Sequence, residues 1–336
     1  MNNPPATPPP CRPAVTFVMP AYNVAPYIDE AIGSIVAQSF ADWELIVVDD
    51  CSTDDTADKA REWERREPRV RVLQTERQTG SAFIPRKTAI EAAKSGLICC
   101  VDADDRIAPD FMELMMRRRR DTGADIVYPS MWSLDDTASR RLLPLDTGLY
   151  GKTMEGRDAV RLTLGDWDIN TNGALKERRL YMSLYERMPD FPSHTFADEL
   201  LTRYLIYDAR MVAFSDAAYY YRSNPESITR KVSVKQFHYL FNNLALISFT
   251  RERYGVGSEE YVLAQKQNFF GYYSALLMLN ESQLTDTETK EARRLTDRAR
   301  GAIDYGSIRD RLSWRFRLTY MLPEKAFILF RKFKRF

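Results

Sequence analysis

The chain has 336 residues, 44% of them hydrophobic and 28% charged, an ordinary globular composition that argues against wholesale disorder, collagen and coiled coil. Its length fits one large domain or two, because a single domain usually has about 100–200 residues. The net charge is +1, but residues 309–336 hold nine Lys or Arg and two Asp or Glu, a surplus of +7 that leaves −6 for the rest. Nucleic acid is therefore not the expected partner of the main body.

The cysteines and the first residues bear on the cellular compartment. The four cysteines, Cys11, Cys51, Cys99 and Cys100, show no CxxC spacing, which favours reduced thiols in an intracellular protein over disulfides or zinc. Residues 1–13 are Pro-rich and predicted to be a disordered leader, without the charged-then-apolar layout of a signal peptide. No stretch approaches the roughly 18 apolar residues of a spanning helix. We therefore expect neither signal-peptide export nor a membrane span.

Apolar segments predict the strands of an α/β fold. Four precede residue 102, and a fifth follows: Val15–Met19, Glu44–Val48, Val70–Gln74, Leu97–Val101 and Asp125–Trp132. The intervening segments are long enough to be crossover helices, as parallel pairing requires. Continuous apolarity within the second and fourth segments is typical of a sheet that is covered on both faces. The sequence thus predicts a mostly parallel sheet, whose ligands bind beyond the carboxyl ends of the strands.

Polar residues follow three of these strands. They are Pro20-Ala21-Tyr22-Asn23 after the first, Asp49-Asp50-Cys51-Ser52-Thr53-Asp54 after the second, and Asp102-Ala103-Asp104-Asp105 after the fourth. The chain has neither the GxGxxG loop of dinucleotide enzymes nor the GxxxxGK[ST] loop of P-loop proteins. A nucleotide bound at these strand ends would therefore be held with carboxylates.

The three carboxylates after the fourth strand repel one another unless a cation or hydrogen-bond donors compensate them. Oxygen ligands suit Mg²⁺ or Mn²⁺, which commonly take one or two protein carboxylates and complete their shell with phosphates and water. The same residues also fit a solvated acidic turn before a helix with Pro109 in its first turn. After the second strand, Ser52–Asp54 can be explained as the start of a helix. A helix start does not explain Asp49 and Asp50, so their position at the strand end favours contact with a ligand.

The second half of the chain is predicted to be mainly helical. A loop-rich stretch covers Leu134–Tyr150, and helices are predicted over Phe237–Tyr254, Glu259–Asn280 and Asp286–Tyr305. The aromatic run Tyr219–Tyr221 interrupts the helical pattern. We place domain boundaries at 14–230 for the α/β domain, 231–308 for a helical region and 309–336 for a basic tail.

Three blocks resemble the family 2 glycosyltransferases, which are inverting enzymes with a GT-A nucleotide-diphospho-sugar domain. They are Val15–Asn23, Ser34–Phe40 followed by Trp43–Asp54, and Val101–Asp105, in the family's order and spacing. The resemblance covers about residues 15–230 and is nearest to bacterial members that build capsule, exopolysaccharide or lipopolysaccharide. It implies a GT-A fold with a Rossmann-like, mostly parallel sheet, here with a helical C-terminal extension.

The resemblance also implies roles for the strand-end residues. Pro20, Tyr22 and Asp50 would hold the nucleotide base, Asp102 the ribose region, and Asp104 a Mn²⁺ or Mg²⁺ ion on the diphosphate. The other residues expected to bind the nucleotide-sugar are Asn23, Asp49, Arg86 and Ala103. Arg86 matches the family's arginine before the fourth strand, although Lys87 stands where the family usually has asparagine.

Inversion requires a base that takes the proton of the acceptor hydroxyl. The family supplies an Asp from an ED motif at a helix start, and the corresponding stretch here is Thr195–Leu200. This alignment makes Asp198 the base and puts Ala197 where the family has Glu, whereas a shift by one residue would select Glu199. Both carboxylates also fit exposed positions at a helix start. Trp167 and Asn172 are candidates for the acceptor side.

Together these residues predict a metal-dependent inverting glycosyltransferase with a UDP-sugar donor and a saccharide or lipid-linked acceptor. One alternative is a catalytically degenerate binding or assembly subunit, which Ala197 favours. A sugar nucleotidyltransferase is the other, although such enzymes usually carry a glycine-rich basic loop where this chain has Pro20–Asn23.

The end of the chain predicts a membrane-surface helix. On a helical wheel one face groups apolar residues and the other basic residues: Ala326, Leu329, Phe330, Phe333 and Phe336 against Arg331, Lys332, Lys334 and Arg335. This amphipathic pattern is typical of a helix on an anionic membrane, here the inner face of the cell membrane for a cytoplasmic enzyme. The same pattern fits a terminal helix docked on its own protein with a solvated basic side.

Overall fold

A computed structural model describes residues 12–134, 141–143, 147–165, 169, 172–188, 193–223, 233–281, 283–324 and 326–328. The chain divides into two compact units. Unit 1 comprises residues 1–159, 168–189 and 205–223, and unit 2 comprises residues 160–167, 190–204 and 224–336. Most of the predicted leader, the predicted boundary at residue 230 and the last eight residues of the predicted tail lie outside the described residues.

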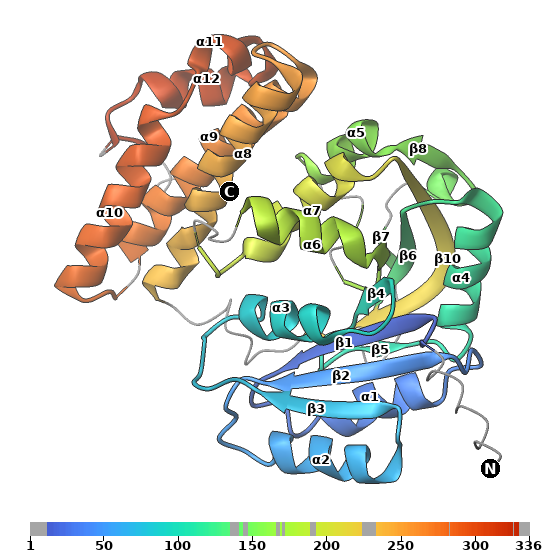
Figure 1. Ribbon diagram of the computed structural model, residues 1–336. Helices are drawn as coiled ribbons and strands as arrows, with labels where there is room; N and C mark the ends of the chain where they lie inside the picture. Colours follow the sequence, from blue (N-terminus) through green and yellow to red (C-terminus); the bar gives the residue numbers. More distant parts are fainter. Residues whose placement is uncertain are drawn as a thin grey trace, which may run out of the picture. The chain divides into compact units, whose positions relative to one another are not determined.

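Unit 1 is built on one mixed sheet (Figure 1). Its strands within the described residues are β1 (Val15–Ala21), β2 (Trp43–Asp49), β3 (Val70–Gln74), β4 (Leu97–Cys100), β5 (Arg106–Ile107), β6 (Ile126–Ser133), β7 (Arg141–Leu143), β8 (Thr153–Glu155), β9 (Leu175–Glu177) and β10 (Met211–Tyr221). Their order is β3-β2-β1-β4-β9-β6-β10-β5, with β7 beside β6 and β8 beside β10. The strands from β3 to β4 are parallel, as are β6 and β10, so the predicted mostly parallel α/β sheet is confirmed.

Helices cover both faces of the sheet, which explains its continuous apolar strands. The helices that lie at least partly in unit 1 are α1 (Ile28–Val36), α2 (Thr56–Arg66), α3 (Phe83–Ala92), α4 (Phe111–Thr122), α5 (Gly156–Ala159), α6 (Arg178–Arg187) and α7 (Ala197–Asp208), which continues from unit 2. Phe17 of β1 lies in one apolar cluster with Ile32 of α1 and Phe111 of α4. The neighbouring Val18 points to the opposite face and is equally buried.

All five strands expected from the apolar segments are present. Cys99 and Cys100 are buried in β4, as the apolar run predicts. The sequence patterns missed the short strands β5, β7, β8 and β9 and the long strand β10, the partner of β6, whose last residues form the aromatic run. Its register shifts between Phe214 and Ala218, so a simple alternation of apolar and polar residues is interrupted there.

Unit 2 contains the long helices that the sequence predicts (Figure 1). They are α8 (Tyr239–Tyr254), α9 (Glu259–Glu281), α10 (Asp286–Gly301), α11 (Tyr305–Ile308) and α12 (Trp314–Met321). A capping box between Thr285 and Glu288 explains where α10 begins, because each side chain satisfies the other residue's backbone N–H. No helix among the described residues is both long and apolar enough to cross a membrane.

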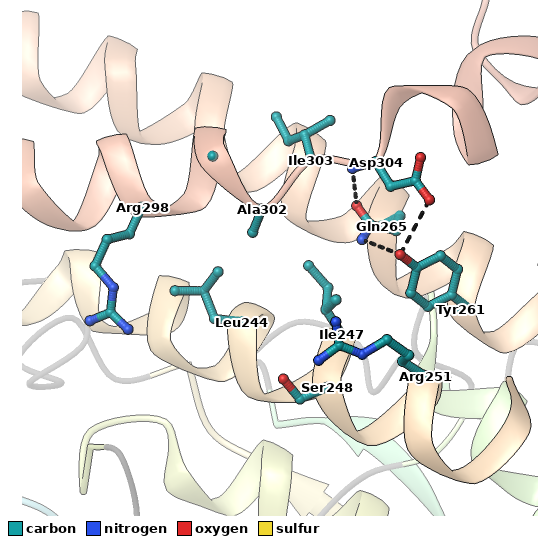
Figure 2. Close-up of a pocket in the computed structure, with 11 residues that line it drawn as sticks. Leu244, Ile247, Ser248, Arg251, Tyr261, Gln265, Arg298, Ala302, Ile303 and Asp304 are labelled. Atoms are coloured by element: carbon teal, nitrogen blue, oxygen red, sulfur yellow. Dashed lines mark hydrogen bonds between the residues drawn. The ribbon is translucent and has the colours of Figure 1, made fainter. Parts of the chain in front are cut away.

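A pocket of about 590 Å³ lies among α8, α9 and the end of α10 (Figure 2). On one side, Gln265 accepts a bond from the Asp304 backbone N–H and donates one to the Tyr261 hydroxyl, which in turn donates to the Asp304 carboxylate. This closed network ties the turn after α10 to α9. Arg251 and Arg298 line the same pocket, but none of the predicted nucleotide-binding or catalytic residues does.

Candidate functional site

The predicted nucleotide-binding residues lie at the switch point of the sheet, where the order of the strands reverses. The chain proceeds from β1 outward to β2 and β3 and then returns to add β4 on the other side of β1. In such sheets the crevice beyond the carboxyl ends of the strands at this point is where ligands bind. The Asp50 N–H donates to the Ala21 carbonyl (2.8 Å) and the Val101 N–H to the Val18 carbonyl (3.0 Å), so the three strand ends are adjacent.

Asn23 joins the end of β1 to the segment after β2. Its side-chain oxygen accepts from the Thr53 N–H at 2.8 Å, and its own N–H donates to the Ser52 hydroxyl at 3.0 Å. Asn23 has φ 50°, a left-handed conformation that asparagine tolerates better than most residues. Pro20 is buried, and Tyr22 between them is half-buried. Asn23 therefore has a structural function at the predicted base-binding position.

Asp49 and Asp50 are 1% and 3% exposed. Asp49 accepts from the Ser52 N–H and from the Gln74 amide. Asp50 accepts from the backbone N–H groups of Thr79 (2.9 Å) and Gly80 (3.2 Å), and also from the hydroxyls of Thr75 and Thr79. Asp50 thus fixes the loop that follows β3. A ligand that contacts Asp50 would share carboxylate oxygens that already accept these hydrogen bonds.

Arg86 and Asp102 are brought together, although 16 residues separate them. The Arg86 guanidinium from α3 lies 3.2 Å from one oxygen of Asp102, at the end of β4. Asn172 donates to the other oxygen of Asp102 and accepts from Arg86. Arg86 is buried, and Asp102 keeps 29% of its side chain exposed. Arg86 and Asn172 therefore fix the orientation of the Asp102 side chain, part of which is exposed to solvent.

The neighbouring carboxylates differ in their environments. Asp105 is buried and accepts from the Tyr219 hydroxyl (2.5 Å) and the Arg222 N–H (2.8 Å). Burial, together with the nearby charges of Asp102 and Asp104, raises the pKa of Asp105 well above its usual range. Asp105 thus anchors β10, whereas Asp104 is half-buried and Ala103 between them is buried.

These residues do not enclose a metal ion by themselves. The described residues contain no cluster of three or more His, Cys, Asp or Glu side chains that could hold one. Asp105 is buried and tied to β10, so Asp102, which Arg86 and Asn172 orient, and Asp104 are the two partly exposed carboxylates of this strand end. A pair of carboxylates fits an ion that takes its other ligands from a substrate diphosphate and water.

The predicted base lies in the first turn of α7, in the part of that helix that belongs to unit 2. Asp198 is half-buried, and its carboxylate accepts from the Glu199 N–H at 3.1 Å. Glu199 lies 3.7 Å from the guanidinium of Arg203, which is fully buried and also donates to the Thr163 carbonyl. Burial raises the pKa of Glu199; Arg203 opposes this increase, and Asp198 adds to it. Glu199 therefore supplies negative charge that compensates the buried Arg203 guanidinium.

The turn that precedes α7 is strained. Phe196 has φ 61°, which is unusual for a bulky side chain, and its carbonyl accepts from Asn242 of α8. Asn242 is buried, so this bond is shielded from water. The contact fixes the backbone two residues before Asp198.

Of the two candidates for the acceptor side, Asn172 bonds Asp102 and Arg86, and Trp167 lies outside the described residues. Other residues of this environment were not predicted from the sequence. Tyr219 lies 114 residues from Asp105, and Asn242 lies 46 residues from the Phe196 carbonyl that it bonds, whereas Arg203 is only one helical turn from Glu199. Only the β-strand character of residues 211–221 carries a local signal for Tyr219.

Comparison with known proteins identifies the domain. The model of the glycosyl transferase family 2 matches residues 16–169. TuaG of Bacillus subtilis, a glycosyltransferase named for teichuronic acid biosynthesis, is 36% identical over 156 residues, which are 46% of this chain and 59% of TuaG. The chain thus spans less than two thirds of that relative.

Two solved structures share the fold. One is TarS 1–349 of S. aureus in complex with UDP-GlcNAc, with a TM-score of 0.57 at 18% identity, covering 90% of this chain and 93% of that one. The other is the mannosyltransferase PcManGT of Pyrobaculum calidifontis with GDP-Man and Mn²⁺, with a TM-score of 0.50 at 17% identity, covering 96% and 87%. The predicted GT-A fold with a helical C-terminal region is confirmed. Residues 16–169, a little under half of the chain, are therefore similar to glycosyltransferase family 2.

Proposed function

We propose that this protein transfers a sugar from a nucleotide-diphosphate donor to a hydroxyl of a saccharide or lipid-linked saccharide during surface polysaccharide biosynthesis. The observation that carries the proposal is the convergence of Tyr22, Asp50, Asp102 and Asp104 at the switch point of a family 2 domain. A UDP-sugar is the first donor to test, because the TarS structure contains UDP-GlcNAc.

Asp104 would hold a divalent cation, Mn²⁺ or Mg²⁺, together with the diphosphate, and the PcManGT complex with Mn²⁺ supports this. The bound cation would neutralise charge on the departing nucleotide. Asp102, oriented by Arg86 and Asn172, would contact the ribose region. Tyr22 and Asp50 would bind the base. Arg86 would also offset the negative charge of the strand-end carboxylates, which would otherwise repel an anionic donor.

Asp198 would take the proton of the acceptor hydroxyl as that oxygen attacks the anomeric carbon. The choice of Asp198 over Glu199 rests on Arg203, since its buried guanidinium requires Glu199 as a counter-charge. A variant of Asp198 should therefore lose turnover without losing stability, whereas a variant of Glu199 should lose stability as well.

The basic C-terminal residues would associate with the inner face of the cell membrane, where a lipid-linked acceptor would be available. A charge of +7 over residues 309–336 favours an anionic lipid surface, with about 1 kcal/mol for each Lys or Arg near it.

Nucleotide release from UDP-GlcNAc and UDP-glucose, measured with Mn²⁺, Mg²⁺ or EDTA and with a lipid extract as acceptor source, tests the proposal. Release that needs a metal and is absent in Asp104→Asn supports it. Metal-dependent nucleotide binding without release from any donor would instead favour the degenerate binding subunit.

A further inference from the structure

Large exposed apolar side chains gather at one element of unit 2. Of the eight large hydrophobic side chains that are exposed among the described residues, five lie in or directly after α12: Trp314, Phe316, Leu318, Met321 and Leu322. Trp314 is 67% exposed, Leu318 53% and Met321 78%. A contiguous group of this kind marks an interaction site more often than scattered single residues do.

The opposite side of α12 attaches it to the protein. The Phe316 ring packs edge-on against Phe270 of α9 at 4.9 Å, and the Tyr320 ring stacks on Tyr305 of α11 at 4.1 Å. Slightly farther along, Phe327 is buried against Tyr273 of α9 at 4.7 Å. The described part of the predicted tail is therefore held on α9 by aromatic contacts, which orient α12 within unit 2.

The spacing of the exposed residues defines one helical face. Trp314, Leu318 and Met321 are separated by four and three residues, so at about 100° per residue they fall on one narrow arc. Arg315 and Arg317 fall on either side of this arc, and Phe316 and Tyr320 fall opposite it. We call the face formed by Trp314, Leu318 and Met321 the α12 face.

We propose that the α12 face inserts into the headgroup region of an anionic lipid bilayer. The inference rests on the proposed membrane association and names the element that enters the lipid. An apolar face flanked by arginines, with a tryptophan at its start, matches the water–lipid interface, where tryptophan is favoured and arginine can reach phosphates. Arg309 and Arg311 lie just before the helix, and four more Lys or Arg follow residue 330. This charge selects an anionic bilayer over the same basic face of a second copy of the chain.

The test is co-sedimentation of the full chain with vesicles of phosphatidylcholine, with and without phosphatidylglycerol. We expect binding to the anionic vesicles and an apparent affinity at least about tenfold lower for the double variant Trp314→Ser/Met321→Ser. Val256→Ser is the matched control, because Val256 is 68% exposed in unit 2 outside α12 and should not alter binding. An unchanged thermal midpoint would show that each variant is folded.

A second readout reports insertion directly. Acyl-chain-brominated lipids should quench part of the tryptophan fluorescence of the wild type, and Trp314→Phe should remove that quenching while binding remains. Wild-type binding that the double variant retains in full would overturn the α12 inference and leave membrane association standing. Failure of the wild type to bind anionic vesicles would refute both. A wild-type dimer that the double variant abolishes, without vesicle binding, would assign the face to a second copy.

Discussion

Two strand-end carboxylates of unit 1 are satisfied by a different kind of group from the carboxylates of unit 2, whereas a third, Asp102, faces Arg86. Asp50 and Asp105 accept from backbone N–H groups and hydroxyls, which are neutral donors. In unit 2, by contrast, Glu199 faces Arg203, Glu260 faces Arg161, and Glu324 faces both Arg293 and Arg300. Neutral donors fix a carboxylate without cancelling its charge, whereas an arginine cancels it.

This difference indicates what each set can do. A strand-end region in which Asp49, Asp50 and Asp104 accompany the Asp102–Arg86 pair favours a cation, and through it a diphosphate. The glutamates of unit 2 that pair with arginines hold helices together. Asp198, in the first turn of α7, accepts a hydrogen bond from the Glu199 backbone N–H.

The largest effect should come from removing the carboxylate of Asp198. Asp198→Asn keeps the shape but cannot accept the acceptor proton, so turnover should fall by about 10²–10⁴-fold. Affinity for the donor nucleotide should remain. Steady-state kinetics with nucleotide binding as the control measures both, and undiminished turnover would move the base to Glu199 or elsewhere.

Next in size is the loss of the buried cation of unit 2. Arg203→Met should lower the free energy of unfolding by about 3–5 kcal/mol, because it leaves Glu199 and the Thr163 carbonyl without their buried partner. Arg311→Met is the control, since its ion pair with Glu259 is largely exposed and contributes less than about 1 kcal/mol. Chemical denaturation compares them, and equal losses would contradict the buried-pair account.

Unit 1 also buries a cation, but there we expect its removal to be favourable. Burial lowers the pKa of Lys176 from 10.5 to about 8, which corresponds to about 3 kcal/mol against folding at neutral pH. Lys176→Met should therefore increase stability by up to that amount. Between pH 8 and 10.5 the unfolded wild type binds more protons than the folded protein, so wild-type stability rises with pH and the gain fades. If burial of the charge is not the cause, unfolding curves would show the same stability gain of Lys176→Met over the wild type at every pH.

The smallest effect concerns the loop that Asp50 fixes. Asp50→Asn replaces one accepting oxygen with an amide that cannot accept from Thr79 or Gly80, at a cost of about 1–3 kcal/mol. The exposed Asp216→Asn should cost less than about 0.5 kcal/mol. If both variants unfold alike, Asp50 does not hold the loop.

The sequence predicted the strand framework well, because β1 to β4 and β6 are apolar segments with polar ends. It predicted the long helices α8, α9 and α10 from their periodicity. It missed β10, where the strand register shifts after Phe214. It also did not predict the aromatic attachment of α12 to α9, since Phe316 and Phe270 meet only in the folded chain.

For the site, the carboxylates after β2 and β4 were accessible to sequence reasoning because their positions follow from strand ends. Their partners were not. Tyr219 reaches Asp105 across 114 residues and Asn172 reaches Asp102 across 70, and no local pattern encodes such pairs. Of the arginine pairs, Glu199 with Arg203 is an (i,i+4) pair within α7, whereas Glu260 with Arg161 is set by tertiary structure.

Calorimetric titration of UDP, with and without Mn²⁺, into the wild type, Asp104→Asn and the exposed control Asp216→Asn tests the central claim most directly. The account predicts binding that Mn²⁺ strengthens in the wild type and in Asp216→Asn, and a loss of the Mn²⁺ effect in Asp104→Asn alone. If Mn²⁺ strengthened UDP binding equally in all three proteins, the strand-end carboxylates would not be the metal-dependent donor site.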